Sequence, residues 1–353
     1  MIRLRDLTPY LCAADATTRE VVERLNKASP YLFQVVVSPD GKLLGTVTDG
    51  DIRRAMLKGV ALDAPATECM HRAPNTGRVG QDVENRHKLA ATGGYRPFLP
   101  VLDDAGVLRE ILVQGDVAGG PARAVVMAGG PGTRLGEKTR NTPKPLLLLG
   151  EQPILGHVLD ALEDAGVRQI DITIHYLAEQ IETFVAKRAN KAVIRLVREN
   201  MRLGTAGALS KLDPAPETPV LVVNGDVVSK ADFGALAEFH EKHGLDGTIA
   251  AARHRVEVPF GVIRYGENGE FEGIEEKPRL DYFVAGGIYY LSPEFLRLVP
   301  QDQPMDMPEL LNLGRKAGLQ VGLFPLHEYW IDVGRPDDLS LAIRDHGNRL
   351  KSS

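Results

Sequence analysis

Two fixed cations beside a glycine-rich turn are the first feature of this sequence that could do chemistry. Residues 124–150 read AVVMAGGPGTRLGEKTRNTPKPLLLLG, in which an apolar run breaks into glycines and then supplies Arg134 and Lys144. Glycines let backbone N–H groups approach an anion, and nearby cations add charge that suits phosphate groups. The alternative is an ordinary strand-to-helix turn with solvated cations, which the glycine turn alone would favour.

The glycine spacing excludes two common phosphate-binding loops. A P-loop needs a glycine followed by Lys and then Ser or Thr, but Gly136 is followed by a glutamate and then a lysine. A dinucleotide fingerprint that began at Gly130 and Gly132 would need a third glycine where Leu135 stands. An oxidoreductase of the dinucleotide-binding type is therefore excluded.

Composition narrows the class of protein. The 353 residues are 43% hydrophobic, which is enough for a sizeable core and predicts two or more domains. The formal net charge of −5 argues against a nucleic-acid partner, which would usually need a basic face. Cys12 and Cys69 have neither metal-ligand spacing nor the density of a disulfide scaffold. Because the start lacks the apolar segment of a signal peptide or membrane span, we expect a cytoplasmic protein with no membrane partner.

The first part of the chain contains an internal repeat. A helix, a strand, a turn and a strand follow one another, and a weaker copy repeats this order; each copy ends in Gly-Asp. The glycine-rich residues 119–123 then indicate a linker into a new buried strand. We therefore predict a boundary near residue 120, with units at residues 1–60, 61–119 and 121–353.

Downstream of residue 120, apolar strands alternate with amphipathic helices. This alternation predicts an α/β domain with a mixed, mainly parallel, Rossmann-like sheet covered by helices on both faces. In such sheets ligands bind beyond the carboxyl ends of the strands, where the glycine loop would lie. The predicted helices are at residues 154–166, 177–188 and 233–244, and the predicted strands are at residues 124–127, 170–176 and 219–226.

The glycine loop belongs to a long motif. GGPGTRL followed by NTPKPLLLLG resembles the signature of the sugar-1-phosphate nucleotidyltransferases. The resemblance continues in the family's order through ENMRLGTAGAL, LVVNGDVV, FGVI, EEKP, AGGIYYL and YWIDVGRPDDL, so it covers essentially everything after residue 121. It implies a GT-A-like nucleotidyltransferase domain that makes a nucleotide-sugar and pyrophosphate from a nucleoside triphosphate and a sugar 1-phosphate.

The reaction needs positioning and charge neutralisation, because the attacking phosphate oxygen is already ionised and requires no general base. By resemblance, Arg134 holds the leaving phosphates, Lys144 the α-phosphate and Lys277 the sugar phosphate. The same resemblance pairs Asp226 and Asp332 as ligands of Mg²⁺, which commonly takes one or two protein carboxylates. Outside these motifs, each aspartate would read as a turn or capping residue, and the residues around Lys277 as a solvated charge run.

Further residues are implied to bind the nucleotide and the sugar. At residues 204–207, contact between the backbone and the base would explain the small side chains. Ala285 stands where many relatives have Asn, and this departure leaves the identity of the sugar open. Arg202 stands where many relatives have Pro. The implied binding residues are Ala128, Gly129, Gly130, Gly132, Thr133, Glu199, Gly204, Thr205, Ala206, Gly207, Asn224, Gly225, Gly261, Glu276 and Gly287.

The repeat before residue 120 has a resemblance of its own. GTVTDGDIRRAM resembles the end of a CBS motif, so residues 1–119 would form an α+β CBS pair. In that family Thr48 and Asp51 would hold the ribose and phosphate of a regulatory purine nucleotide. The second copy has Val113 in place of the threonine but keeps Asp116. We expect the chain to form a homo-oligomer through this pair. The alternative to nucleotide binding is a dimerising module that binds no ligand.

The motifs LGTAGAL, NGDV and WIDVG most resemble GDP-sugar enzymes. We therefore expect a guanylyltransferase that uses GTP, Mg²⁺ and a hexose or aminohexose 1-phosphate, and makes a GDP-glucosamine or GDP-mannose type of product. Thymidylyl, uridylyl or cytidylyl transfer are alternatives of the same fold. A nucleotide-sensing protein that binds without turnover is the competing class, and the joint retention of the catalytic cations and aspartates counts against it.

Overall fold

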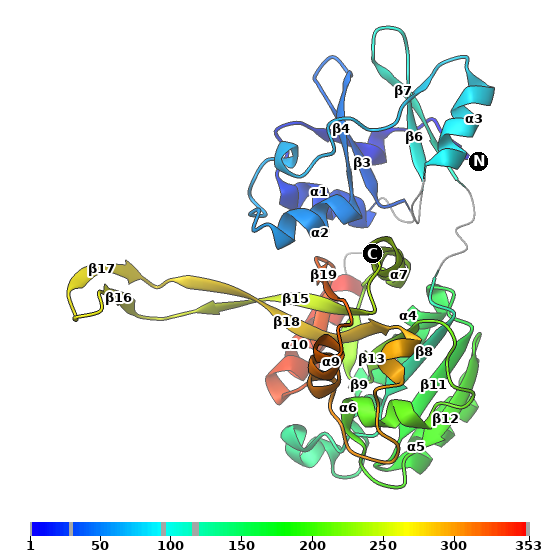
Figure 1. Ribbon diagram of the computed structural model, residues 1–353, viewed down its shortest axis with the longest axis vertical. Helices are drawn as coiled ribbons and strands as arrows, with labels where there is room; N and C mark the ends of the chain where they lie inside the picture. Colours follow the sequence, from blue (N-terminus) through cyan, green and yellow to red (C-terminus); the bar gives the residue numbers. More distant parts are fainter. Residues whose placement is uncertain (1, 28–30, 93–96, 115–119, 351–353) are drawn as a thin grey trace.

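The structure, a computed structural model, describes residues 2–27, 31–92, 97–114 and 120–350. Figure 1 shows a smaller N-terminal part above a larger C-terminal part, with a two-stranded ribbon that reaches out to one side. Among the described residues, no helix combines the length and the apolar character needed to cross a bilayer.

The N-terminal part consists of two units with the same strand pairing. In each unit the first strand is parallel to the second, and the second is antiparallel to the third. The predicted repeat is therefore visible in the pairing itself. The first unit contains β2 (Leu11–Ala13), α1 (Thr18–Lys27), β3 (Phe33–Val37), β4 (Leu43–Thr48) and α2 (Asp49–Leu57); the second contains β5 (Gly77–Arg78), α3 (Asp82–Ala91), β6 (Phe98–Leu102) and β7 (Leu108–Val113), to which β1 (Ile2–Leu4) adds an edge strand.

Aromatic stacking joins the two units. The rings of Phe33 and Phe98 are parallel within 5°, with their centroids 3.9 Å apart. Val35 of the first unit and Ile111 of the second are fully buried in the same apolar cluster. Short 3-10 turns at Thr8–Tyr10 and Ala66–Glu68 complete this part. Burial of these side chains holds the two small sheets together as one body.

A seven-stranded sheet in the order β12-β11-β8-β13-β18-β15-β19 forms the centre of the C-terminal part. Every neighbouring pair is parallel except the two pairs that contain β18, so the sheet is mixed and mainly parallel, as predicted. Its strands are β8 (Arg123–Met127), β11 (Gln169–Ile174), β12 (Val193–Arg198), β13 (Val220–Asn224), β15 (Gly247–Glu257), β18 (Arg279–Leu291) and β19 (Val321–Leu326).

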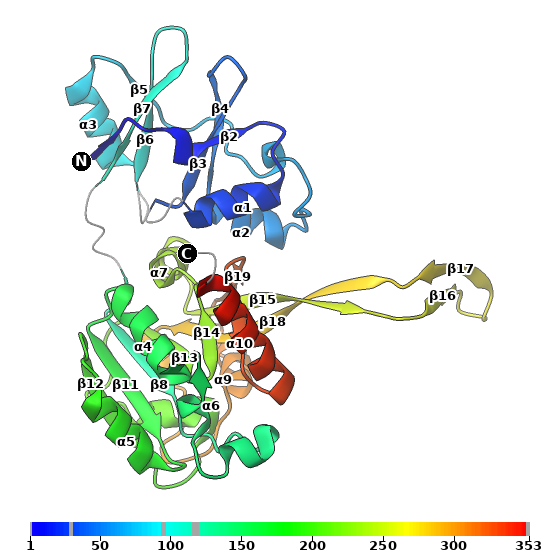
Figure 2. The ribbon, with the colours of Figure 1, turned by 180° about the vertical axis from the view of Figure 1, so that it is seen from behind.

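Helices cover both faces of this sheet (Figure 2), and each face has its own apolar core. In β8, Val126 packs into one core and its neighbour Val125 into the other. A strand buried on both faces must be apolar at every position, which explains the unbroken run in this segment. The helices are α4 (Ile154–Asp164), α5 (Ala178–Lys187), α6 (Gly204–Gly207), α7 (Phe233–Lys242), α8 (Pro293–Leu296), α9 (Met307–Lys316) and α10 (Pro336–Leu350).

Short elements shape the carboxyl end of the sheet. The 3-10 segments η3 (Thr133–Thr139) and η4 (Lys144–Leu146) follow β8, and the small hairpin of β9 (Leu148–Leu149) and β10 (Gln152–Pro153) leads into α4. A further 3-10 turn, Ala208–Lys211, follows α6. After β13 the chain forms β14 (Val227–Ser229), which pairs antiparallel with β20 (Trp330–Asp332).

Strands β15 and β18 continue beyond the sheet as a two-stranded ribbon. The pairing runs without a break from Ala251 and Ala285 out to Glu257 and Arg279. A hairpin of β16 (Gly261–Tyr265) and β17 (Phe271–Glu276) forms its tip. Figure 1 shows this ribbon standing away from the body; we call residues 251–285 the arm.

Candidate active site

A cleft of about 250 Å³ lies at the carboxyl ends of β8 and β13. This is the position at which open α/β sheets bind ligands. The glycine loop, η4, the segment before α6, and β20 provide its walls. Its lining includes Met127, Ala128, Gly130, Pro131, Gly132, Thr133, Arg134, Lys144, Pro145, Arg202, Thr205, Asn224, Gly225, Asp226, Asp332 and Gly334.

The pairing of β14 with β20 brings the two predicted acidic residues together. In this ladder Val227, next to Asp226, is the partner of Asp332, and the Val333 N–H donates to the Asp226 carbonyl at 3.1 Å. Lys144 Nζ forms an ion pair with Asp226 and lies 3.8 Å from Asp332 Oδ1. Residues far apart in the sequence therefore form one charged cluster.

The acidic pair carries more negative charge than Lys144 can balance. Burial, together with the nearby Asp226 carboxylate, raises the pKa of Asp332 to about 6. The Oδ1 atoms of both aspartates are buried and accept no hydrogen bond from the residues that the structure describes. Two unsatisfied carboxylate oxygens that face one cleft are the donors that a hard divalent cation prefers. The residues present therefore fit a Mg²⁺ site.

The glycine loop brings its backbone against Lys144. Gly132 adopts a φ of 63°, and a Cβ there would lie 2.9 Å from Lys144 Cβ and 3.1 Å from Thr139 Cγ2. The Thr139 hydroxyl donates to the Gly132 carbonyl at 3.0 Å and fixes the turn. Glycine is required here by both the left-handed backbone and the close approach. Arg134, two residues after Gly132, lies exposed at the cleft.

Glu199 and Gly129 lie behind the cleft wall rather than in its lining. A Cβ on Gly129 would be 2.5 Å from Glu199 Oε1. Glu199 is buried and accepts a hydrogen bond from the Leu203 N–H at 3.0 Å. Burial raises the pKa of its carboxyl, although the Leu203 N–H opposes this shift. In this structure the pair supports the loop, and its predicted contact with a substrate stays a prediction.

Packing within the chain explains the two glycines of the segment at residues 204–207. A Cβ on Gly204 would lie 2.6 Å from the Met305 carbonyl oxygen, and one on Gly207 would lie 2.5 Å from that of Gln303. The N–H groups of Ala206 and Gly207 both donate to the Met305 carbonyl, at 2.9 and 3.0 Å. Close packing against residues 303–305 therefore accounts for Gly204 and Gly207, and the expected contact with a nucleobase stays a prediction. Of the four residues, Thr205 lines the cleft.

Gly287 lies at the edge of the cleft, where a Cβ would meet Asn224 Nδ2 at 2.8 Å. Its close approach allows the Asn224 side chain to sit beside the acidic pair. Asn224 Oδ1 is also buried and accepts no hydrogen bond from the described residues. Both predicted residues therefore belong to the neighbourhood of the cleft, Asn224 in its lining and Gly287 directly behind Asn224.

The structure does not bring one group of predicted residues together with the others. Lys277, Glu276 and Gly261, expected to join Arg134 and Lys144, lie on the arm and not in the cleft of their own chain. The physical reason is that the ladder of β15 and β18 is continuous, so it carries these residues outward along the strand direction. The Lys277 backbone is left-handed, with a φ of 46°.

The lining also contains residues that we did not predict. Arg202 adds a further cation to Arg134 and Lys144, and Met127, Pro131, Pro145 and Gly334 complete the walls. The sequence could have indicated Arg202, because it departs from the family pattern and is the charged residue among the small and apolar residues 201–209. The prolines and Gly334 had no chemical signal.

A second cavity, of about 380 Å³, lies between the N-terminal part and α7. Thr48 and Asp51 line it, and they bond one another: the Thr48 hydroxyl donates to Asp51 Oδ2 at 2.6 Å within a capping box that begins α2. Capping alone would account for this pair of residues. Val113 is buried at the end of β7, and Asp116 lies outside the described residues.

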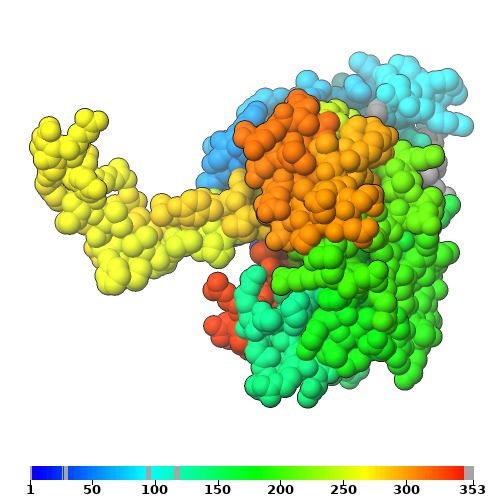
Figure 3. Space-filling model, turned by 60° about the horizontal axis from the view of Figure 1, so that its bottom comes forward, coloured from blue at the N-terminus to red at the C-terminus, as the bar shows by residue number. Residues whose placement is uncertain are grey.

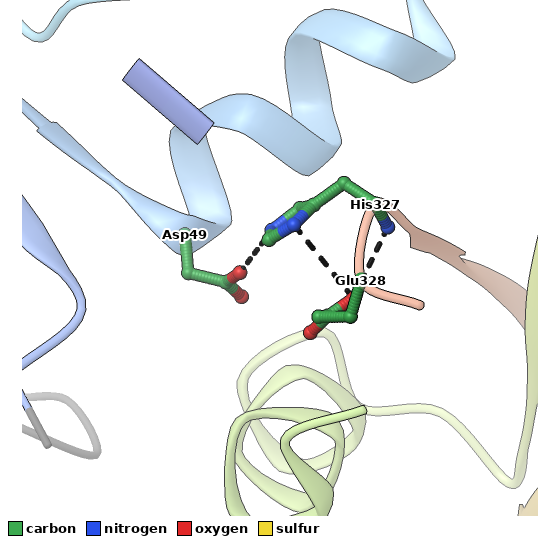
Figure 4. A group of neighbouring side chains, drawn as sticks. All are labelled: Asp49, His327 and Glu328. Atoms are coloured by element: carbon green, nitrogen blue, oxygen red, sulfur yellow. Dashed lines mark hydrogen bonds and ion pairs between the residues drawn. The ribbon is translucent and has the colours of Figure 1, made fainter. Parts of the chain in front are cut away.

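A buried ion-pair network joins the two parts beside this cavity. Arg53 of α2 donates to Asp49 and to Glu328, and its guanidinium lies 3.6 Å from the centre of the Phe324 ring. Figure 4 shows that His327 also reaches Asp49, with Nε2 2.5 Å from Oδ1.

Burial would raise the pKa of Asp49 and Glu328, but Arg53 and His327 together outweigh it and hold both pKa values below their usual range. The ligand atoms of Asp49, His327 and Glu328 lie close enough to hold a metal ion. Because Arg53 donates to both carboxylates and His327 bonds to Asp49, we interpret the cluster as an ion-pair network. The sequence did not indicate this network, because its residues come from the N-terminal and C-terminal parts and meet only in the folded protein.

Comparison with known proteins gives two family matches. The family model described as nucleotidyl transferase matches residues 123–348, and that described as CBS domain matches residues 4–58. The catalytic subunit beta of mannose-1-phosphate guanylyltransferase from Drosophila pseudoobscura pseudoobscura is 35% identical over 228 residues, which are 62% of this chain and 61% of that protein. The mannose-1-phosphate guanyltransferase of Schizosaccharomyces pombe is 33% identical over 229 residues, 61% of this chain and 62% of that protein.

Among solved structures, HddC from Yersinia pseudotuberculosis complexed with GMP-PN is 25% identical, with a TM-score of 0.50, and covers 64% of this chain and 99% of that one. The predicted fold class is confirmed by these matches and by the sheet. The chain spans about 61% of the length of the curated relatives it matches.

Proposed function

The chain belongs to the nucleotidyl transferase family, and on that premise we propose that it is a sugar-1-phosphate guanylyltransferase. It would transfer GMP from GTP to a hexose or aminohexose 1-phosphate and release pyrophosphate. The observation that carries the proposal is the cluster of Lys144, Asp226 and Asp332 beside the glycine loop, at the carboxyl end of the parallel sheet.

The side chains of this cleft suit a reaction that needs positioning. An ionised phosphate oxygen attacks the α-phosphorus, and the bond to the pyrophosphate oxygen breaks, so the charge on the transferred group must be held in place. In the cleft lining, Lys144 is half-buried beside the aspartates, whereas Arg134 and Arg202 are exposed. We assign Lys144 to the α-phosphate and the arginines to the phosphates that leave. The N–H groups of the glycine loop would fix the triphosphate.

Asp226 and Asp332 would hold Mg²⁺, which when bound neutralises charge on the crowded phosphates. Their unsatisfied Oδ1 atoms and the raised pKa of Asp332 support this assignment. With the aspartates engaged by a cation, Lys144 would be free to leave Asp226 and contact the phosphate. Asn224 is the remaining unsatisfied acceptor beside them and would order the same site.

Guanine is the base that the relatives favour. Curated relatives named mannose-1-phosphate guanylyltransferase support a GDP-sugar product, and the HddC complex contains GMP-PN, a guanine nucleotide. Ala285 stands where many relatives have Asn, so the identity of the sugar has to be determined by experiment. The cytoplasmic location stays a prediction.

The test is pyrophosphate release from each of GTP, ATP, CTP, UTP and dTTP against a panel of hexose and aminohexose 1-phosphates. Each pair is measured with Mg²⁺ and with a chelator. GTP should give the highest rate, and the chelator should remove it. A different preferred triphosphate would overturn the choice of guanine alone, whereas nucleotide binding without turnover for any pair would favour a sensing protein over an enzyme.

We also propose that the second cavity binds a regulatory purine nucleotide. Thr48 and Asp51 lie on its N-terminal wall, while Lys242 and His243 of the C-terminal part face the same space. Calorimetric titration of the full chain with AMP, ATP, GMP and GDP tests this proposal. Binding that Thr48→Val weakens at least tenfold would support it, and no heat for any nucleotide would refute it. The matched control is Thr67→Val, at a half-buried position outside the cavity lining.

A further inference from the structure

The arm has one charged face and one apolar face. Side chains alternate across a β-ribbon, so cross-strand pairs two apart share a face. On one face, Asp281 pairs with Arg253 and Arg255 at 2.7 and 2.9 Å, and Arg279 pairs with Glu257. On the other face the pairs are Val256 with Leu280 and His254 with Tyr282. Leu280 and Tyr282 are exposed.

The tip also has an exposed apolar face. On one face of its hairpin, Ile263 pairs with Ile274 and Tyr265 with Phe271. These four side chains are 56–71% exposed, and Phe260 beside them is 72% exposed. A two-stranded ribbon is marginal by itself in water, and an exposed apolar patch of this kind marks an interaction site. The face needs a partner surface.

The body of the same chain does not provide that surface. The ladder is continuous from Ala251 to Glu257, so the arm leaves along the direction of the sheet. From Gly287, at the edge of the cleft, to Lys277 the chain advances about 30 Å at roughly 3.3 Å per residue. Figure 3, a view from another side, also shows the arm projecting from the body.

Lys277 differs from the other cations of the arm in its ion pairing. Each of the arm arginines, Arg253, Arg255, Arg264 and Arg279, has a carboxylate partner, whereas Lys277 has none among the residues that the structure describes. Its backbone is held at a φ of 46°, a strained conformation for a residue with a side chain. An unpaired cation on a strained backbone beside an apolar surface indicates that an anion reaches it when the surface is covered.

We propose that the arm docks on a second copy of this chain and places Lys277, with Glu276 beside it, at the cleft of that copy. The inference rests on the proposed function, because the anion would be the phosphates bound there. A twofold exchange is self-consistent: each apolar face is covered, and each cleft receives the cation that its own chain carries away. Lys277 would then act on the substrate of the partner chain.

Sedimentation at several concentrations tests the docking. We expect wild type to be a dimer and Ile263→Asp/Phe271→Asp to sediment as a monomer with an unchanged melting temperature of the body. Val262→Asp, on the other face of the same strand, is the matched control and should remain a dimer. A monomeric wild type, or a dimer that survives the double substitution, would overturn the proposal.

Subunit mixing tests the exchange. Lys277→Ala leaves the cleft intact, and Asp226→Asn leaves the arm intact, so each variant alone should be nearly inactive. When the two variants are co-expressed with different tags and pair at random, half of the dimers contain one copy of each. Each of these mixed dimers has one complete cleft. About a quarter of the wild-type rate is then expected.

Purified mixed dimers that stay as inactive as the single variants would show that Lys277 does not act across the interface, as would full activity of Lys277→Ala alone. If wild type shows no turnover with any substrate pair, the proposed function fails. The docking is then still decided by sedimentation.

Discussion

Arg53 and Glu328 form an ion pair that joins the N-terminal and C-terminal parts, with Nη2 2.6 Å from Oε1 and side chains that are 0% and 6% exposed. Arg53 lies in α2, which begins at the cavity beside Thr48. Glu328 lies four residues before Asp332, on the segment that leads into β20. A short stretch of chain therefore connects the second cavity with the acidic pair of the cleft.

Removal of Arg53 should destabilise the protein strongly. Arg53→Met leaves Asp49 and Glu328 buried without their cation, which costs about 3–5 kcal/mol of the free energy of unfolding. Arg19→Met removes an exposed pair with Asp63 and should cost less than about 1 kcal/mol. Urea unfolding of both variants measures the difference, and equal losses would contradict the importance of the buried network.

Asp226→Asn should abolish turnover without unfolding the protein. The change removes the charge of the proposed Mg²⁺ ligand and keeps the shape, so we expect kcat to fall by about 10²–10³ or more, as for loss of one strong electrostatic contact. Asp337→Asn, at an exposed position in the first turn of α10, is the control and should retain the wild-type rate. Pyrophosphate release and a melting curve give both readouts; substantial activity in Asp226→Asn would mean that the ligand assignment is wrong.

Asp332→Asn should stabilise the chelator-treated protein at pH 8. The pKa of Asp332 is raised to about 6 in the folded state, so ionisation of this carboxyl opposes folding. The protonated carboxyl therefore contributes fully to the stability of the folded state below the ordinary Asp pKa of about 4. This contribution is lost as the pH rises through 6. As the pH is lowered from 8 to 5, the melting temperature of wild type should therefore rise relative to that of Asp332→Asn. Melting curves with a chelator measure this gap, and a gap independent of pH would contradict the shift. Activity should be lost in the variant at both pH values.

Neighbouring glycines of the loop should respond differently to alanine. In Gly129→Ala the new Cβ would meet Glu199 Oε1 at 2.5 Å, so we expect a loss of about 1–3 kcal/mol from overpacking. A Cβ on Gly130 meets nothing within 4 Å, and Gly130→Ala should change the stability by no more than about 0.5 kcal/mol. Chemical denaturation distinguishes the two, and equal stability would show that Glu199 moves aside freely.

Arg202→Ala should weaken the use of the triphosphate. A charge-assisted contact to phosphate contributes about 1.5–3 kcal/mol, so kcat/KM for GTP should fall by roughly 10- to 100-fold. Arg198→Ala, on the same segment but paired with Glu179 and Glu182 outside the cleft, is the control and should have little effect. Steady-state kinetics at saturating sugar phosphate provides the measurement. An unchanged kcat/KM would remove Arg202 from the site.

Most secondary structure could be predicted because apolar periodicity and glycine turns act over a few residues. The strand expected at residues 124–127 is β8 (Arg123–Met127), and the helix expected at residues 154–166 is α4 (Ile154–Asp164). The small residues at 204–207 show the limit of this reasoning. Their small size indicated a close approach, but it could not show that residues 303–305 pack against Gly204 and Gly207.

By itself, the sequence determined the helices and strands, the repeat before residue 120 and the motif that indicates the reaction, because all of these depend on the spacing of neighbouring residues. Only the tertiary structure decided that Arg53 meets Glu328 and that Lys277 leaves the cleft of its own chain. The physical reason is that such meetings depend on how distant segments pack and on the direction in which β15 and β18 leave the sheet. Neither quantity is encoded in the spacing of neighbouring residues.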